Sequence, residues 1–199
     1  MSFLLPLPGN LQQNGLFIIA EIGGAAGMII REINAKYDPR LARYKPPHVT
    51  ITGSSGAGPL PPSVTTSELW DKLAPITSTT GLLTLEVGSP HRFMQSDIVV
   101  LPLDPHGPLR VLHDRIVTSG LPFQRARFTF SPHCTLSLYP SLTKEAEREL
   151  MAIRVRAPLV IDSVIVYQTL DPQPSKKLLE LPLSGNEPNN VAFPASNRT

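Results

Sequence analysis

The sequence predicts a fold of the α+β class with a largely antiparallel sheet, and three observations support this prediction. Segments with strand patterns occur in consecutive pairs and are mixed with segments of helical spacing. Prolines number 22 in 199 residues, about 11% and roughly twice ordinary usage. Because proline ends helices and is excluded from central strands, its spread indicates many short elements. Apolar residues make up 41% of the chain, enough for a sizeable core.

Each element is predicted from its pattern of apolar side chains. Strands are expected where apolar runs or strict alternation occur, and helices where apolar residues recur at three- and four-residue spacing. Thr66 or Ser67 is expected to cap a helix that stops before Pro75, and Gly120 is expected to cap another. The predicted strands are, in order, 16–22, 48–52, the pair 82–87 and 97–103, then 127–130, 133–138, 160–169 and 177–183. The predicted helices are 25–36, 66–74, 109–118 and 144–153. One domain is expected over residues 1–184, followed by a mobile tail over 185–199.

Composition and charge exclude several functional classes. Cys134 is the only cysteine, so an internal disulfide and a thiolate zinc site are excluded, and a reducing, cytoplasmic setting is expected. With 18 basic and 16 acidic residues, the formal charge is +2, so any nucleic-acid contact must be local. The apolar stretch 15–30 contains Glu21 and is too short to span a bilayer, so no membrane association is expected.

One short segment occurs twice. Residues 47–52 read PHVTIT and residues 132–137 read PHCTLS, so Pro, His and Thr are identical in copies that lie 85 residues apart. Because side chains alternate along a strand, each copy presents a histidine and a threonine on one face and apolar residues on the other. If the two strands are neighbours related by a pseudo-twofold axis, two imidazoles and two hydroxyls face one another across a small gap.

Such a set of side chains suits phosphoryl chemistry. Hydrolysis of a phosphodiester needs a base for the attacking water and an acid for the leaving oxygen, and histidine serves as either near neutral pH. Two hydroxyls on rigid strands can stabilise charge on the non-bridging oxygens without a metal. A single copy of the pattern is usually structural, but its repetition favours a functional interpretation. Both histidines are then needed in opposite protonation states, which predicts a bell-shaped pH profile.

The tetrapeptides His48-Val49-Thr50-Ile51 and His133-Cys134-Thr135-Leu136 resemble the paired His-x-Thr/Ser-hydrophobic (HxTx) motifs of the 2H phosphoesterase superfamily. That superfamily includes 2'-5' RNA ligases and cyclic phosphodiesterases. The resemblance covers residues 15–184 in element order and implies a bilobal duplicated fold, with antiparallel sheets, helices outside and a central cleft. It also implies metal-independent hydrolysis of 2',3'-cyclic phosphates or 2'-5' linkages in nucleotides or RNA ends, without a cofactor. His48 and His133 correspond to the acid–base pair, and Thr50 and Thr135 to the phosphate ligands.

Two other functions remain open. RNA ligation is chemically the reverse of 2'-5' cleavage, although Tyr139 and Pro140 stand where an arginine often follows the second motif in the ligase branch. A module that binds nucleotides or RNA ends without cleaving them is the other alternative, but binding alone does not require two titratable groups beside hydroxyls. A monomer is expected, because the internal duplication already supplies the facing half of the site.

Further residues near the motifs are candidates for substrate binding. Aromatic side chains can stack on a nucleobase, at roughly 1–3 kcal/mol per base, and arginines can hold a phosphate. The candidates are Tyr44, Arg127, Tyr139 and Tyr167. Arg125 is expected to share a strand face with Arg127, and the glycine-rich loop 53–58 follows the first motif strand. The remaining histidines lack partners at metal-ligand spacing, so no metal site is expected. They are predicted to be surface or loop residues: His91, His106 and His113.

Overall fold

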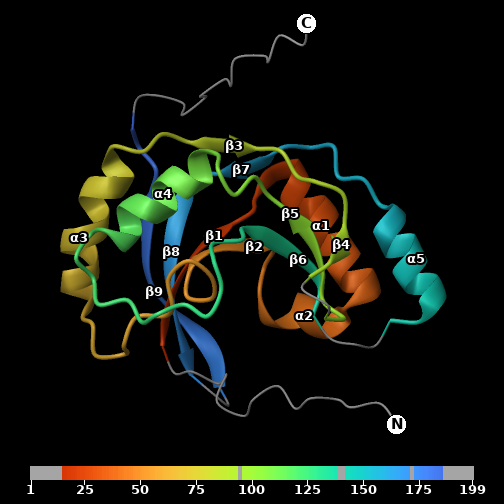
Figure 1. Ribbon diagram of the computed structural model, residues 1–199, viewed down its shortest axis with the longest axis horizontal. Helices are drawn as coiled ribbons and strands as arrows, with labels where there is room; N and C mark the ends of the chain where they lie inside the picture. Colours follow the sequence, from red (N-terminus) through yellow and green to blue (C-terminus); the bar gives the residue numbers. More distant parts are fainter. Residues whose placement is uncertain (1–14, 94–95, 139–141, 171–172, 186–199) are drawn as a thin grey trace, which may run out of the picture.

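The structure, a computed structural model, describes residues 15–93, 96–138, 142–170 and 173–185 (Figure 1). From residue 186 onward, the predicted tail lies outside the described residues. The strands are β1 (Leu16–Glu21), β2 (His48–Thr52), β3 (Leu83–Leu85), β4 (His91–Arg92), β5 (Val99–Pro102), β6 (His133–Ser137), β7 (Leu159–Ile161), β8 (Ser163–Leu170) and β9 (Gln173–Pro182). The helices are α1 (Gly24–Tyr37), α2 (Pro39–Tyr44), α3 (Thr66–Ser78), α4 (Pro108–Val117) and α5 (Lys144–Ala152).

The strands form two sheets in which neighbouring strands are antiparallel. The larger sheet has seven strands in the order β4-β5-β6-β2-β1-β8-β9, and β3 pairs with β7 in the smaller one. The first half of the chain contributes β1 and β2, the second contributes β5 and β6, and the two halves meet where β2 lies beside β6. The predicted α+β class with antiparallel sheets is therefore confirmed.

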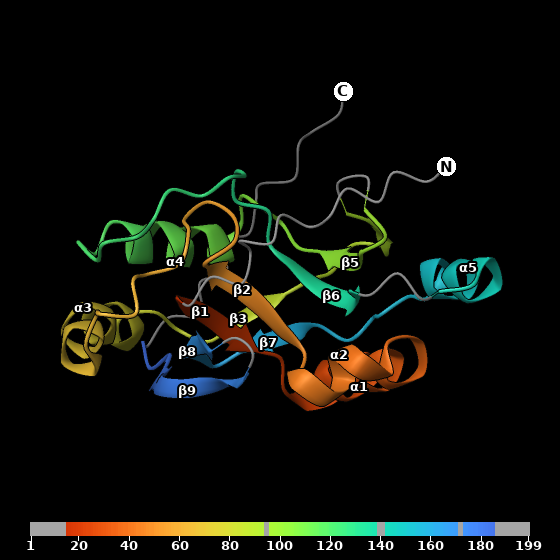
Figure 2. The same cartoon turned by 90° about the horizontal axis from the view of Figure 1, so that it is seen from below.

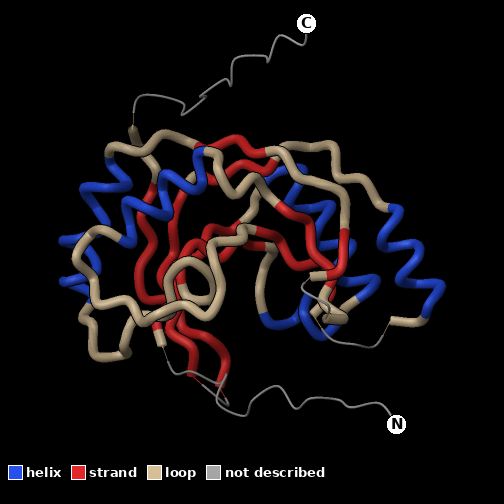
Figure 3. Tube along the Cα trace, in the orientation of Figure 1, coloured by secondary structure: helices blue, strands red, loops and turns tan. Residues whose placement is uncertain are grey.

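The helices gather at two ends of the large sheet. Figure 3 shows one group around α3 and α4 and another around α1, α2 and α5, with the strands running between them. In Figure 2, α4 lies beside one end of β2, and α1 with α2 lies near the other end. None of the helices in the described parts has the length and apolar character that a membrane span needs.

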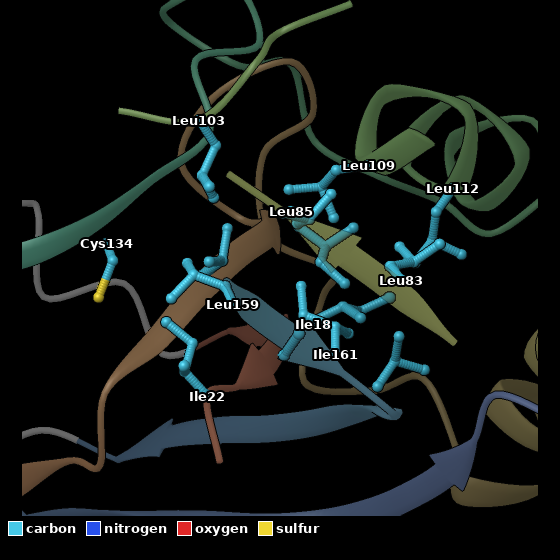
Figure 4. Close-up of a cluster of buried hydrophobic side chains, with 14 of the residues drawn as sticks. Ile18, Ile22, Leu83, Leu85, Leu103, Leu109, Leu112, Cys134, Leu159 and Ile161 are labelled. Atoms are coloured by element: carbon cyan, nitrogen blue, oxygen red, sulfur yellow. The ribbon is translucent and has the colours of Figure 1, made fainter. Parts of the chain in front are cut away.

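The hydrophobic core lies between the sheets and these helices. Ile18 of β1, Leu83 of β3 and Leu112 of α4 meet there and are at most 1% exposed (Figure 4). Burying such a side chain contributes about 1.5–3 kcal/mol. The apolar sides of both motif strands belong to the same core, so core packing holds the two strands that carry the repeated motif.

Helix α3 differs from the prediction at both ends. Thr65 is its N-cap, in place of the predicted Thr66 or Ser67, because Thr65 and Glu68 form a reciprocal capping box. The helix also continues through Pro75 to Ser78. Hydroxyl groups supply donors where the helix ends: Thr79 Oγ1 donates to the Pro75 carbonyl at 2.8 Å, and Thr80 Oγ1 donates to the Ile76 carbonyl at 2.7 Å. These bonds satisfy carbonyls that the last turn leaves free.

The prediction of a strand at residues 127–130 was wrong. Phe128 makes one isolated bridge to Ser55, and Arg127, Phe128 and Thr129 are exposed. The segment has alternating polar and apolar residues, but β6 already has β5 and β2 on its two edges, so no edge is open beside it. The expected strands 82–87 and 97–103 are shorter and lie in different sheets. One bridge, between Val87 and Leu103, joins them.

Candidate active site

The two copies of the repeated segment are neighbouring antiparallel strands at the centre of the large sheet. Val49 of β2 pairs with Cys134 of β6, and these residues hold the same position in their copies. Antiparallel pairing through equivalent residues is the register of a local twofold axis, so each motif histidine lies opposite the threonine of the other copy. The pseudo-twofold arrangement expected from the sequence is therefore present.

Alternation along the two strands separates a core face from an accessible face. The residues on the core face are at most 1% exposed: Val49, Ile51, Cys134 and Leu136. The residues on the other face are half-buried: His48, Thr50, His133 and Thr135. The structure thus brings together the four residues that the sequence singled out.

The two imidazoles are held in the same way. His48 Nδ1 lies 2.9 Å from the carbonyl oxygen of Pro46, and His133 Nδ1 lies 2.7 Å from that of Ser131. A carbonyl oxygen only accepts, so Nδ1 must carry the proton and donate it. This fixes each ring and leaves Nε2 as the nitrogen that can take up or release a proton. In both copies, the carbonyl two residues before the histidine accepts this hydrogen bond and orients the ring.

Burial is the main cause that lowers the pKa of both His48 and His133 below the usual 6.5. The hydrogen bonds to the backbone carbonyls act in the opposite direction, because they favour the imidazolium. The charge of another histidine also acts on each of them: His133 lowers the pKa of His48, and His91 lowers the pKa of His133.

Polar and charged side chains surround His48. Glu21 of β1 pairs with His48 in the sheet register, and its charge raises the pKa of that histidine. The hydroxyl of Tyr167 donates to Glu21 Oε1 at 2.8 Å, while burial and this bond raise the pKa of Tyr167 to about 12. Lys45 lowers the pKa of His48, and burial lowers the pKa of Lys45 itself. Neighbouring charges therefore act on the pKa of His48 in both directions.

A cavity of about 540 Å³ lies against the second motif and is lined by both His133 and Thr135. Three phenylalanines also line it: Phe17, Phe93 and Phe128. The ring centroid of Phe93 lies 4.5 Å from that of His133. A volume of this size is typical of small-molecule sites, and its apolar walls suit a flat aromatic group.

Basic side chains and a glycine-rich loop complete the walls of this cavity. Arg125 and Arg127 both line it. The prediction that they share a strand was wrong, because no strand includes residues 125–127. Arg127 is exposed, with its guanidinium 5.3 Å from the centre of the Phe128 ring. Gly53 and Gly58 also line the cavity, so the loop that follows the first motif borders the site.

The predicted substrate-binding residues have different outcomes. Arg127 lines the cavity, and Tyr167 reaches the first motif through Glu21. Tyr139 lies outside the described residues, and Tyr44 ends α2 with its side chain outside the description.

Glu21 and the three phenylalanines are site residues that the sequence patterns did not predict. One signal for Glu21 was available: it is the lone charge in an otherwise apolar strand. The phenylalanines come from three separate segments, so no local pattern could have grouped them.

Two other sequence predictions concern buried groups. His113 was predicted to be a surface or loop residue, and this was wrong, because it is 3% exposed and stacks on Phe130 with ring centroids 3.9 Å apart. Cys134 is buried on the core face as expected, and burial raises the pKa of its thiol to about 12. Within the described residues, no group of three or more potential metal-ligating side chains lies together. Metal independence stays a prediction.

Comparison with family models finds a match over residues 23–172 to the model described as the 2'-5' RNA ligase superfamily. The match covers well over half of the chain and includes both motif strands. The chain belongs to the 2'-5' RNA ligase superfamily. The resemblance found from the two tetrapeptides is therefore confirmed at the level of the superfamily.

Solved structures share the fold of this superfamily member at low sequence identity. LigT of E. coli complexed with 3'-AMP matches with a TM-score of 0.53 and 17% identity, over 86% of this chain and 98% of LigT. A Thermus thermophilus protein matches with a TM-score of 0.57 and 16% identity, over 87% of this chain and 100% of its own. A structure described as a phosphoesterase matches with a TM-score of 0.50 and 18% identity, over 86% and 99%. Among curated proteins, none matches the sequence.

Proposed function

We propose that this protein is a phosphodiesterase that hydrolyses 2',3'-cyclic phosphates or 2'-5' linkages of nucleotides or RNA ends. The observation that carries the proposal is the central β2–β6 pair, in which the register through Val49 and Cys134 places two His/Thr sets on one accessible face. His48 and His133 act as base and acid, and Thr50 and Thr135 hold the non-bridging oxygens of the phosphate between them.

The hydrogen bonds of the imidazoles support this assignment. With Nδ1–H donated to a backbone carbonyl, Nε2 of each ring is free to exchange a proton with substrate or water. Neither ring has to turn when it changes protonation state, because Nδ1 donates in both forms. The chain therefore supplies two oriented proton carriers on rigid strands, and such positioning is a large part of catalytic acceleration.

The cavity beside His133 supports a direction for the substrate. In an in-line displacement at phosphorus, the attacking and leaving oxygens lie on opposite sides. The cavity is lined by His133 and Thr135 and by aromatic rings, so it suits the nucleoside, and the ribose oxygen then leaves on that side. In hydrolysis of a 2',3'-cyclic phosphate, His133 protonates the leaving ribose oxygen while His48 takes the proton of the attacking water. The two charges beside His48 oppose each other, since Lys45 lowers the pKa of that imidazole and Glu21 raises it, so the position of the cavity carries this assignment.

The test is hydrolysis of 2',3'-cyclic AMP in a buffer that contains a chelator. We expect His48→Ala and His133→Ala each to lower kcat by about 10²–10⁴-fold, the usual contribution of general acid–base catalysis. His106→Ala is the matched control, because His106 is exposed and lies on the loop before α4. Full activity in either motif variant contradicts the proposal. Loss of wild-type activity in chelator contradicts metal independence.

Ligation is the second candidate, and the observation that favours it is the match to the 2'-5' RNA ligase model. The same acid and base, run in reverse, join a 2',3'-cyclic phosphate to a 5'-hydroxyl. Incubating two such RNA fragments with the protein and separating the products by electrophoresis tests this direction. Calorimetry with 2',3'-cyclic AMP, followed by chromatography of the same sample, tests the remaining alternative, because binding without product supports a non-catalytic module.

A further inference from the structure

Both motif strands contain the same irregularity at the same position. In the β1–β2 pairing, Ile18 lies opposite Thr52 and Ile19 opposite Thr50, so Ile51 has no partner residue in β1. In the β5–β6 pairing, the register passes from Thr135 to Ser137 in one step of β5, which leaves Leu136 without a partner. Each is a one-residue β-bulge that directly follows a motif threonine. The repeat therefore extends from the sequence into the backbone.

Each bulge is closed by a buried side chain from the other half of the chain. His113 of α4 donates Nδ1–H to the carbonyl oxygen of Ile51 in β2 at 2.7 Å. Asn34 of α1 donates Nδ2–H to the carbonyl of Leu136 in β6 at 2.8 Å, and to that of Thr135 at 3.2 Å. His113 and Asn34 are each 3% exposed. The helix of each half thus holds the motif strand of the other half, consistent with the positions of α1 and α4 in Figure 2.

Each of these bonds supplies a donor to a buried backbone carbonyl at a bulge. A bulged residue is left out of the regular ladder, and a buried carbonyl without a donor costs about 1–3 kcal/mol. Ile51 and Leu136 are both 0% exposed, so water does not readily replace the donor. A bulge also bends the strand and changes the direction of nearby side chains, which is why bulges occur beside active sites. The residues immediately before the bulges are Thr50 and Thr135.

The donors themselves are held in place by packing. The ring of His113 stacks on Phe130, and Gly56 passes so close that an added Cβ there would lie 2.4 Å from Nε2. Gly56 has a φ of +72°, which also favours glycine. Asn34 lies on the face of α1 that packs against β6. His113 therefore has little room to turn away from its carbonyl, and Asn34 is held by two hydrogen bonds to β6.

We infer that Asn34 and His113 are positioning residues, which fix the two bulges so that the hydroxyls of Thr135 and Thr50 point at the phosphate. Each donor acts on the other half of the chain: Asn34 orients the hydroxyl of Thr135, and His113 orients that of Thr50. This inference rests on the proposed function, because it takes the two threonines as phosphate ligands. It goes beyond that function by naming side chains outside the accessible face on which its geometry depends.

Crossed double-mutant cycles on kcat/KM for 2',3'-cyclic AMP test the inference. The positioning variants are His113→Phe, which keeps a ring on Phe130 but has no donor, and Asn34→Leu. The threonine variants are Thr50→Val and Thr135→Val. We expect each positioning variant to lower kcat/KM by about ten- to a hundredfold, mostly in kcat. His113→Phe should add little to Thr50→Val but its full effect to Thr135→Val, and Asn34→Leu should show the reverse. Effects that multiply in all four pairs overturn the inference, because a general loss of stability is indifferent to which threonine is present.

Rescue by a conservative variant provides a second readout. In His113→Asn, the amide nitrogen is separated from Cβ by the same number of bonds as Nδ1, so the donor is retained while the ring is lost. We expect this variant to keep more activity than His113→Phe, whereas the opposite order contradicts a role for the hydrogen bond. Thermal unfolding checks that each variant is folded, and Asn34→Ala replaces Asn34→Leu if the bulkier side chain prevents folding.

A measurement without turnover separates this inference from the proposed function. In ¹⁵N amide spectra, Asn34→Leu should shift the signals of β6, and His113→Phe those of β2, although each substitution lies in the other half of the chain. Shifts confined to α1 or α4 overturn the inference. If the crossed shifts appear but the wild-type protein cleaves no phosphodiester, the two bonds still fix the motif strands, and it is the proposed function that fails.

Discussion

The two motif histidines have the same local geometry but different surroundings. His48 sits among charges, with Glu21 and Lys45 acting on it in opposite directions. His133 sits beside the Phe93 ring and lines a cavity with apolar walls. The comparison teaches that an internal repeat sets where the chemical groups lie, while the surrounding segments decide what each group does. The symmetry supplies the pair of histidines, and the asymmetry outside the motifs gives the two rings different surroundings.

The largest expected effect comes from a substrate that distinguishes the two histidines. A nucleoside 3'-(4-nitrophenyl phosphate) with a free 2'-hydroxyl has a leaving group that needs no protonation. With the nucleoside in the cavity, the attacking 2'-hydroxyl lies beside His133 and the leaving group beside His48. We therefore expect His48→Ala to keep activity within about tenfold of wild type, while His133→Ala loses about 10²–10⁴-fold. Release of nitrophenolate measures both, and the reverse pattern reverses the assigned roles.

An intermediate effect is expected from the cavity walls. Phe128→Ala should raise KM for 2',3'-cyclic AMP by about five- to a hundredfold, because stacking on a base contributes roughly 1–3 kcal/mol. The KM for ribose 2',3'-cyclic phosphate, which lacks a base, should change little. Trp70→Ala is the matched control, since Trp70 is an exposed aromatic residue of α3 and does not line the cavity. Equal changes for both substrates would place the base elsewhere.

The smallest effect is a shift of the pH profile. Because burial lowers the pKa of both His48 and His133 below 6.5, the optimum of kcat/KM should lie on the acidic side of that value. Glu21 raises the pKa of His48, so Glu21→Gln should lower it further and move the acidic limb to lower pH. At pH 5 the variant should then keep a larger share of its maximal rate than the wild type does. An unchanged acidic limb would show that His48 is not the base.

The central part of the site could be predicted from the sequence because its information is local. Alternation within residues 48–52 and 133–137 determines which side chains share a face, and the repetition suggests that the strands are neighbours. The structure bears out both points through the Val49–Cys134 register. Twofold pairing makes the four polar groups converge without further information.

The remaining features depend on contacts between distant segments. His113 bonds to a strand residue 62 positions away and Asn34 to one 102 positions away, so neither has a local signal. The segment 127–130 has a strand pattern but no available neighbour, since β5 and β2 occupy both edges of β6. Pro75 was expected to end a helix that nearby hydroxyls sustain. For His113, Asn34 and the segment 127–130 the deciding partner lies outside the window that a sequence pattern covers, whereas Thr79 and Thr80 lie only four residues from the carbonyls that they bond.

The crossed hydrogen bonds also set an order of events during synthesis of the chain. When β2 leaves the ribosome, the donor for Ile51 has not been made, because His113 is 62 residues further on. When β6 emerges, Asn34 is already available for Leu136. The donor for the first bulge is therefore made after its strand, whereas the donor for the second bulge is made before its strand. The motif strand of the N-terminal half thus cannot gain its bond to the Ile51 carbonyl before residue 113 has been made.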